Sequence, residues 1–203
     1  MIFFIVLIKS WYIDIITLCF EVEMSKEIEL KFSINTEIKS KIIAELEKTV
    51  EKCGENHLVD TYYVPYFKDY EVNGETNECL RIRETDNKIV LSYKKIHREC
   101  SPVYCDEYET KISSKDEMEK VLFAIGFSVQ MIIDKTRITY KMDKYEFAFD
   151  SVKNLGELME VELTDPNGNI EDIYSFLKQF GLTEKDVTYE GIQMMMKKKL
   201  AEK

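Results

Sequence analysis

The sequence predicts one α+β domain built mostly from antiparallel strands. Two patterns carry this prediction. Most segments alternate charged and apolar residues at every second position, which is the period of a strand with two different faces. The other segments space their apolar residues three or four apart, as an amphipathic helix does. No internal repeat, low-complexity segment or linker interrupts residues 24–203, so this range is expected to fold as a single domain.

Length, charge and cysteine usage limit the class of function. A chain of 203 residues is long enough to bury a substantial core. Its formal net charge of -10 argues against non-specific nucleic-acid binding, which needs a basic surface. The 5 cysteines are odd in number and form no CxxC pair, so neither a disulfide framework nor a zinc site is expected. A reduced, cytoplasmic location follows from this cysteine usage.

Residues 1–23 form an apolar N-terminal segment that differs from the rest of the chain. A spanning helix needs about 20 mostly apolar residues, and Asp14 would lie near the middle of this one. No basic region precedes the apolar run at residues 2–8, so a secretory signal is not expected. One interpretation is that Met24 is the true start and the segment an upstream over-read. The alternatives are a membrane anchor or interfacial helix, and an extra packed element.

The first predicted strand spans residues 27–32 and has two chemically distinct faces. Glu27, Glu29 and Lys31 share one face, because side chains alternate along a strand. The residues between them are apolar and share the other face. In an ordinary half-buried strand the charged face would meet water.

Four helices are predicted from apolar residues at helical spacing. The first covers residues 35–52, with Asn35 or Thr36 as its cap. Ser114 and Glu117 make a capping box for the second. The third covers about 170–180, and Thr183 is expected to cap the last. The glycines expected to end or follow the first three helices are Gly54, Gly126 and Gly181.

Further strands are predicted between these helices. Asn73-Gly74 is a hairpin-type turn signal, and residues 165–168 form a second strong turn. The expected strands cover about 58–67, 78–84, 88–95, 104–112, 129–141, 145–152 and 157–164.

Charged residues recur two apart in nearly every predicted strand. Any one such doublet is explained by a solvated strand face. The helices, however, must cover apolar surface, and the apolar strand faces are what is available to them. A closed antiparallel barrel would then turn its charged faces inward. The doublets are Arg81/Arg83, Ser92/Lys94, Glu107/Glu109, Lys135/Arg137 and Glu160/Glu162, and Asp150 shares a face with Glu146.

An interior lined with charges is costly unless each charge is paired or bound to something. Arginine and lysine suit the oxygens of a polyanion such as phosphate. Carboxylates suit a hard divalent cation, and Mg²⁺ is commonly held by one or two carboxylates together with substrate phosphates. The pattern therefore indicates a site for a metal–triphosphate. No GxxxxGKS loop is present, so this is not a P-loop design.

The ordered set of these motifs resembles the CYTH family, the triphosphate tunnel metalloenzymes, over about residues 24–195. The family includes class IV adenylyl cyclases, thiamine triphosphatases and inorganic triphosphatases. His57, Asp60 and Tyr62 resemble the segment before the RxR strand in its cyclase-like branch. The motifs that carry the resemblance are Glu27-x-Glu29-x-Lys31, Arg81-x-Arg83, Lys94, Glu107-x-Glu109, Lys135-x-Arg137, Asp150, Leu155-Gly156 and Glu160-x-Glu162.

The resemblance implies a closed eight-stranded antiparallel tunnel, with helices outside, that binds a triphosphate with Mg²⁺ or Mn²⁺. The metal side would be formed by Glu27, Glu29, Asp150, Glu160 and Glu162. The phosphates would be bound by Lys31, Arg81, Arg83, Lys94, Lys135 and Arg137. Among these residues, Glu29, Lys31 and Lys135 are the expected catalytic groups. Additional candidates are Glu107, Glu109 and Tyr189, the last of which resembles a Ser-Tyr signature on the closing helix.

The sequence leaves the reaction open. The first hypothesis is a class IV-type adenylyl cyclase that converts ATP to cyclic AMP and pyrophosphate. The second is a triphosphatase acting on inorganic triphosphate, thiamine triphosphate or a nucleotide. The third is a non-catalytic nucleotide- or polyphosphate-binding module, and the fourth a plain α+β protein with solvated strand faces. ATP or another triphosphate is the expected partner, nucleic acid is not, a membrane is expected only if residues 1–23 are genuine, and cyclase-like members suggest a homodimer.

Overall fold

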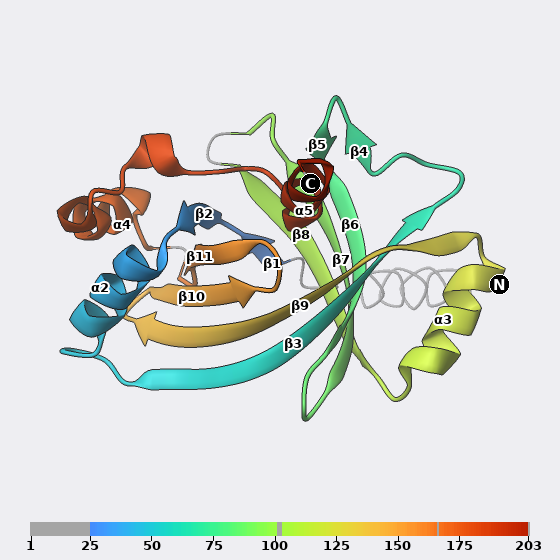
Figure 1. The fold of residues 1–203 in the computed structure, drawn as a ribbon, viewed down its shortest axis with the longest axis horizontal. Helices are drawn as coiled ribbons and strands as arrows, with labels where there is room; N and C mark the ends of the chain where they lie inside the picture. The colour runs from blue at the N-terminus through green and yellow to red at the C-terminus, as the bar shows by residue number, and fades with distance from the viewer. Residues whose placement is uncertain (1–24, 101–102, 166, 203) are drawn as a thin grey trace, which may run out of the picture.

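A computed structural model describes residues 25–100, 103–165 and 167–202; the predicted N-terminal segment 1–23 lies outside the described residues. One large antiparallel sheet dominates the structure, and helices pack around it (Figure 1). The predicted α+β class is therefore confirmed. Among the described residues, every helix is too short or too polar to cross a membrane.

The strands largely follow the predicted boundaries. A separate hairpin, β4 (Glu71–Val72) and β5 (Glu75–Thr76), turns at Asn73 and Gly74, whose φ angles of 55° and 78° fit the predicted turn. The strands of the main sheet are β1 (Ser25–Glu27), β2 (Glu29–Ile34), β3 (Lys52–Pro65), β6 (Glu78–Glu84), β7 (Ile89–His97), β8 (Tyr104–Ile112), β9 (Phe127–Met142), β10 (Tyr145–Val152) and β11 (Gly156–Leu163).

The main sheet runs in the order β1-β8-β7-β6-β3-β9-β10-β11-β2. Its end strands, β1 and β2, do not pair with each other, so the closed eight-stranded tunnel expected from the sequence is not shown. The two end strands are nonetheless consecutive in the chain and separated only by Ile28. The first pairs with β8 and the second with β11. The two ends of the sheet are thus joined by one continuous segment.

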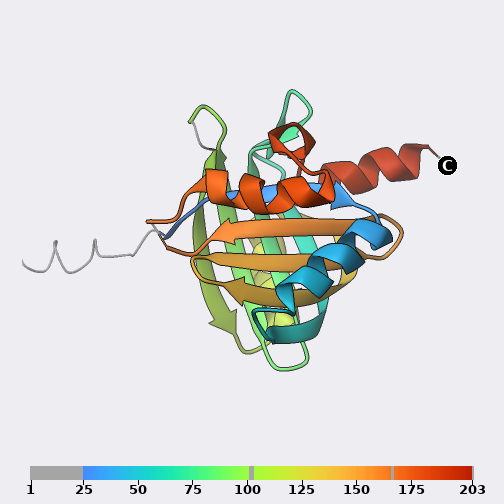
Figure 2. The same ribbon diagram turned by 90° about the vertical axis from the view of Figure 1, so that its left-hand side faces the viewer.

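A hydrophobic core lies between two helices and the outer face of the sheet. The helices α2 (Thr36–Leu46) and α4 (Ile170–Leu177) cross this face (Figure 2). Leu30 and Phe32 of the first predicted strand are buried against them, so helices cover its apolar face. The buried residues of this core are Leu30, Phe32, Ile42, Leu46, Tyr140, Tyr145, Phe147, Phe149, Met159, Val161, Ile173, Leu177 and Leu182.

The helix α3 (Lys115–Ala124) begins where its capping signal predicts. The side chain of Ser114 accepts a hydrogen bond from the backbone N–H of Glu117 at 3.3 Å. Leu122 is the buried residue of this helix and packs in a second cluster with Tyr63 and Ile82. This helix therefore covers β3 and β6 on another part of the sheet.

Two predicted helix boundaries were wrong. The first helix ends at Leu46 rather than near residue 52, because β3 already begins at Lys52 and includes Gly54 at a register shift. Thr183 does not cap the last helix. It caps a short 3-10 turn, η2 (Glu184–Asp186), which follows a similar turn, η1 (Lys178–Phe180).

The last helix, α5 (Ile192–Ala201), begins only after Gly191. Before it the chain is extended along β2: Val187 bridges to Phe32, and the N–H of Thr188 donates to the carbonyl of Lys31 at 2.8 Å. These contacts override the helical preference of the segment. They also carry residues 188–193 to the inner side of the sheet.

The start of α5 covers an apolar stretch of the inner face. Ile192 and Met196 pack in one cluster with Tyr62, Val152 and Leu158. Val152 follows Asp150 by two residues, and Leu158 precedes Glu160 by two residues. Both apolar residues therefore share the inner face with these acids. One end of the inner face is therefore apolar and capped, and the rest is charged.

Candidate functional site

The inner face of the sheet borders a cavity of about 360 Å³. Among the described residues, its lining contains as many acids as bases. The bases are Lys31, Arg81, Arg83, Lys94, Arg98, Lys135 and Arg137. The acids are Glu29, Glu107, Glu109, Glu146, Glu160, Glu162 and Glu190. Tyr62, Tyr104, Tyr189, Ile96 and Ile192 are among the other lining residues.

The register of the sheet places a polar partner directly opposite most of these bases. Cross-strand neighbours are close enough for their side chains to interact. Lys31 of β2 faces Glu160 of β11. The other pairs in register are Arg81 with Ser92, Arg83 with Asp60, Lys94 with Glu107, and Arg137 with Asp150.

Lys31 is held between two carboxylates. Its Nζ lies 3.2 Å from Oε1 of Glu160 and 3.4 Å from Oε1 of Glu29. Burial favours the neutral amine, but the charges of Glu160 and Glu29 outweigh it and raise the pKa of Lys31. This side chain therefore stays cationic at neutral pH.

Arg137 joins the two acids of β10 and β11. Its Nε donates to Oδ1 of Asp150 at 2.6 Å and its Nη2 to Oδ2 at 2.7 Å, and Nη2 also contacts Glu160. Burial would raise the pKa of Glu160, yet the charges of Arg137 and Lys31 hold it well below its usual value. The pKa of Asp150 is lowered in the same way, chiefly by Arg137 acting against burial. Both acids are therefore ionised.

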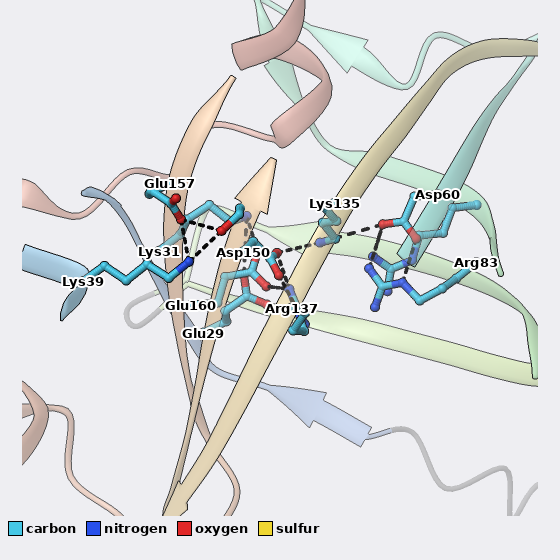
Figure 3. A network of polar contacts seen from close by, with 12 residues as sticks. Glu29, Lys31, Lys39, Asp60, Arg83, Lys135, Arg137, Asp150, Glu157 and Glu160 are labelled. Atoms are coloured by element: carbon cyan, nitrogen blue, oxygen red, sulfur yellow. Dashed lines mark hydrogen bonds and ion pairs between the residues drawn. The ribbon is translucent and has the colours of Figure 1, made fainter. Parts of the chain in front are cut away.

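Lys135 lies between two buried aspartates. Its Nζ is 2.6 Å from Oδ2 of Asp150 and 3.8 Å from Oδ2 of Asp60 (Figure 3). The residue is only 4% exposed. Burial and the positive charge of Arg137 lower the pKa of Lys135 to about 8, against the opposing pull of Asp150. Its side chain can therefore exchange between the ammonium and the neutral amine near pH 8.

Asp60 connects the bases of β6 with Lys135. Its carboxylate accepts two hydrogen bonds of 2.7 Å from Nε and Nη2 of Arg83, and lies 3.7 Å from Nη1 of Arg81. Nε of Arg81 donates to Oγ of Ser92 at 2.9 Å. Burial opposes ionisation of Asp60, but Arg83 and Arg81 lower its pKa far below the usual range.

Three carboxylates form a row at the other end of the charged face. Glu146, Glu162 and Glu29 are neighbours in register across β10, β11 and β2. Burial and the charge of Glu146 raise the pKa of Glu162. Lys94 is the base beside this row: its Nζ lies 2.9 Å from Oε2 of Glu107, and Glu29 and Glu107 raise its pKa against burial.

The carboxylates fit a hard divalent cation by donor type, because Mg²⁺ and Mn²⁺ prefer oxygen ligands. Within the described residues, no three His, Cys, Asp or Glu side chains are arranged as a ready metal cage. The acids are instead turned toward bases, as Glu29 and Glu160 are toward Lys31. Binding of a cation here would require these ion pairs to rearrange.

Most residues predicted for the site do meet around the cavity. Asp150 is the exception among those described: it is 1% exposed and lies behind the lining, bound by Lys135 and Arg137. The side chain of Glu27 lies outside the described part of the chain. The predicted residues that line the cavity are Glu29, Lys31, Arg81, Arg83, Lys94, Glu107, Glu109, Lys135, Arg137, Glu160, Glu162 and Tyr189.

The structure adds residues to which the sequence assigned no role. Glu146 could have been found from its strand phase, which it shares with Asp150. Arg98 follows the end of β7, where no periodic signal exists; its Nη2 donates to the carbonyls of Thr76 and Tyr189 at 2.8 and 2.7 Å. The sequence placed Ser92 in a doublet with Lys94, but it did not indicate the contact between Ser92 and Arg81.

The fold and the site define this chain as an α+β protein whose curved antiparallel sheet carries bases and carboxylates in register on its inner face. The CYTH domain model matches residues 25–189 of this chain. The chain belongs to the CYTH domain family, as the ordered motifs indicated.

Individual relatives agree with this assignment. A protein of Methanocaldococcus jannaschii named "putative adenylate cyclase" is 27% identical over 166 residues, which cover 79% of this chain and 93% of that protein. A solved structure from Pyrococcus horikoshii superposes with a TM-score of 0.68 at 24% identity, covering 83% of this chain and 98% of that one. A Hippeastrum structure, described as a putative adenylyl cyclase with a dominant triphosphatase activity, gives 0.58 at 18%, covering 83% and 91%. At these identities the two structures show the fold alone.

Proposed function

We propose that this protein is a metal-dependent enzyme that acts on a triphosphate compound. The observation that carries the proposal is the cavity itself, in which bases from several strands converge on one space. Bidentate arginines and compact lysine charges are the groups that bind phosphate oxygens. Family membership supports the same conclusion.

The charge of the lining supports a metal requirement. A triphosphate brings several negative charges, while the described part of the lining carries as many acids as bases. The two aspartates behind it, Asp60 and Asp150, add negative charge. A triphosphate would therefore meet a site with no excess of positive charge unless divalent cations accompany it.

We further propose that the curved sheet functions as a closed tunnel. The segment that contains β1 and β2 pairs with both ends of the sheet, with only Ile28 between the two ladders. The carbonyl of Ile28 also accepts a hydrogen bond from the N–H of Leu163 at 3.0 Å, so this residue stays attached to β11. Such a connection leaves the two ends of the sheet beside each other.

The proposed roles divide along the inner face. Lys31, Lys135 and Arg137 neutralise the charge that develops on the reacting phosphoryl group. Arg81, Arg83 and Lys94 bind the rest of the polyphosphate. Mg²⁺ or Mn²⁺, when bound, would polarise a phosphoryl oxygen. The carboxylates proposed to hold it are Glu29, Glu160 and Glu162, together with Glu27 from the sequence.

The favoured reaction is that of an adenylyl cyclase. The ribose 3′-hydroxyl of ATP would attack the α-phosphorus, the bond to the β-phosphate oxygen would break, and pyrophosphate would leave. The hydroxyl proton would pass to solvent or to a nearby base. The name of the M. jannaschii relative supports this choice.

A triphosphatase is the second candidate. Water would attack the γ-phosphorus, the bond from that phosphorus to the oxygen bridging it to the β-phosphorus would break, and orthophosphate, the diphosphate product and a proton would be released. The Hippeastrum structure is described as that of a putative adenylyl cyclase with a dominant triphosphatase activity, and this description supports the second candidate. The two reactions need the same charged groups and differ in which phosphorus lies beside the metal.

Product analysis separates the candidates. Purified protein is incubated with Mg²⁺ or Mn²⁺ and either ATP or inorganic triphosphate, with Glu29→Gln as the inactive control. Cyclic AMP with pyrophosphate identifies the cyclase, and orthophosphate the triphosphatase. Binding of either compound without turnover would leave a binding module. Neither binding nor turnover would overturn the proposal.

A further inference from the structure

Two buried carboxylates lie behind the bases that line the cavity. Asp60 is 0% and Asp150 1% exposed, and neither lines the cavity, although Arg83, Lys135 and Arg137 do. We propose that Asp60 and Asp150 are positioning residues, which hold these three bases in the orientation that a bound triphosphate requires. The inference rests on the proposed function and assigns Asp150 a role other than that of metal ligand.

The hydrogen bonds show how each arginine is oriented. Asp60 accepts from Nε and Nη2 of Arg83, both at 2.7 Å. Asp150 accepts from Nε and Nη2 of Arg137, at 2.6 and 2.7 Å. In both arginines the aspartate therefore fixes the same edge of the planar guanidinium, the one that carries Nε and Nη2. In both arginines this leaves Nη1 as the nitrogen that the aspartate does not occupy, available to an anion in the cavity.

Lys135 links the two carboxylates. Its Nζ donates to Asp150 at 2.6 Å and lies 3.8 Å from Asp60 (Figure 3). It has no acid opposite it in register, since its cross-strand neighbours are Leu58 and Val152. Asp60 and Asp150 lie on the two strands that flank β9, β3 and β10, each two residues from the position opposite Lys135. Three bases from two strands are therefore held by two carboxylates.

This arrangement has a physical rationale. Bases placed close together repel one another, and their long side chains would turn toward water in an empty cavity. A buried ionised carboxylate prevents this through charge-assisted hydrogen bonds of fixed geometry. The side chains then need not be ordered when the ligand binds, which strengthens binding by preorganisation.

A purely electrostatic role predicts the opposite effect of mutation, and this makes the proposal testable. Replacing Asp60 by Asn removes one negative charge near the phosphates, and electrostatics alone would then tighten triphosphate binding. A positioning role predicts weaker binding, because Asn offers Arg83 one acceptor oxygen in place of two. The sign of the change therefore distinguishes the two roles.

The experiment compares Asp60→Asn, Asp60→Glu and Glu157→Gln with the unmutated protein. Glu157 is the matched control, because it also binds a partly buried cation, Lys39 at 2.7 Å, yet does not line the cavity. Calorimetry measures the Kd for inorganic triphosphate with Mg²⁺, and steady-state assays measure KM and kcat with the substrate that is turned over. Circular dichroism and thermal unfolding verify that each variant folds.

We expect Asp60→Asn to weaken triphosphate binding at least about tenfold, to raise KM more than it lowers kcat, and Asp60→Glu to recover part of the loss. Glu157→Gln should change neither Kd nor KM by more than about twofold. A folded Asp60→Asn variant that binds as tightly as the unmutated protein, or more tightly, would overturn the inference. If Asp60→Asn does not fold, the same binding and kinetic measurements are made on Asp150→Asn, and the same outcomes support or overturn the inference.

If neither asparagine variant folds, the carboxylates serve the fold and the inference is overturned. Failure of the unmutated protein to bind any triphosphate has a different meaning, because it overturns the proposed function and the inference with it. The two failures are therefore distinguishable.

Discussion

Glu146 and Glu162 lie directly opposite each other in β10 and β11, on the inner face of the sheet. Two carboxylates in this relation repel, and Glu29 extends the row into β2. Burial and Glu146 raise the pKa of Glu162 above its ordinary value. The folded protein therefore holds a proton on Glu162 more tightly than the unfolded chain does. Its stability falls as the pH rises from the ordinary pKa of a glutamate through the raised pKa of Glu162. A divalent cation would relieve this repulsion.

The first prediction concerns Glu162→Gln. Because the substitution removes a repelling charge, we expect the metal-free protein to become more stable by roughly 0.2–1 kcal/mol. The stabilisation that saturating Mn²⁺ confers on the unmutated protein, about 2.7 kcal/mol at a hundred times its Kd, should shrink. Thermal unfolding with and without Mn²⁺ measures both effects. A variant that is destabilised without metal and still responds fully to Mn²⁺ would contradict the metal assignment.

The second prediction separates catalytic loss from structural loss in the metal-side acids. Glu160→Ala removes one of the carboxylate partners of the partly buried Arg137 and Lys31, so it should cost about 1–3 kcal/mol of stability. Glu29→Ala removes a weaker contact, 3.4 Å from Lys31, and should cost about 1 kcal/mol or less. Both should abolish metal-dependent turnover. Urea unfolding and product assays test the pair, and full activity in folded Glu29→Ala would show that this carboxylate is not needed.

The third prediction is a pH dependence due to Lys135. Its pKa of about 8 means that it is cationic below that pH and loses its charge as the pH rises through it. Lys31 keeps its charge, because its pKa is raised. Triphosphate affinity should therefore fall above about pH 8 by roughly tenfold, the loss of one charge-assisted contact. Calorimetry from about pH 6.5 to about 9.5 measures this, beside Lys135→Met.

In Lys135→Met the affinity should be weaker throughout, and the step near pH 8 should be missing. This variant is needed because triphosphate itself changes protonation with pH. An identical step in the variant would assign the titration to the ligand and not to Lys135.

The fourth prediction concerns the anchor of α2 on the outer face. Nζ of Lys39 donates to Oγ of Ser151 at 2.6 Å and to Oε2 of Glu157 at 2.7 Å. Lys39→Met leaves this partly buried carboxylate without its cation and should cost about 1–3 kcal/mol. Urea unfolding measures the loss. Because these residues do not line the cavity, KM for a triphosphate should stay within about twofold, and a larger rise would mean that α2 acts on the site.

Much of the fold could be predicted from the sequence because its signals are local. Alternation over residues 78–84 and 104–112 matched β6 and β8 residue for residue. The cap signal at Ser114 placed the start of α3, since its side chain accepts from the backbone N–H of Glu117 within one turn. The prediction failed at Thr183, where the local cap is real but distant contacts of Val187 and Thr188 with β2 keep the chain extended.

For the site, the order of residues along each strand was enough to show which side chains share a face. Strand phase is a property of consecutive residues, so Glu29, Lys31 and Arg137 could be assigned to the inner face from local sequence. Which of them meet depends on the tertiary structure, because cross-strand pairs need a register between segments far apart in the chain. That register puts Asp60 against Arg83, and Asp150 behind the cavity rather than in its lining. The chain thus encodes an inward charged face locally, while the partner of each charge is fixed only when the sheet assembles.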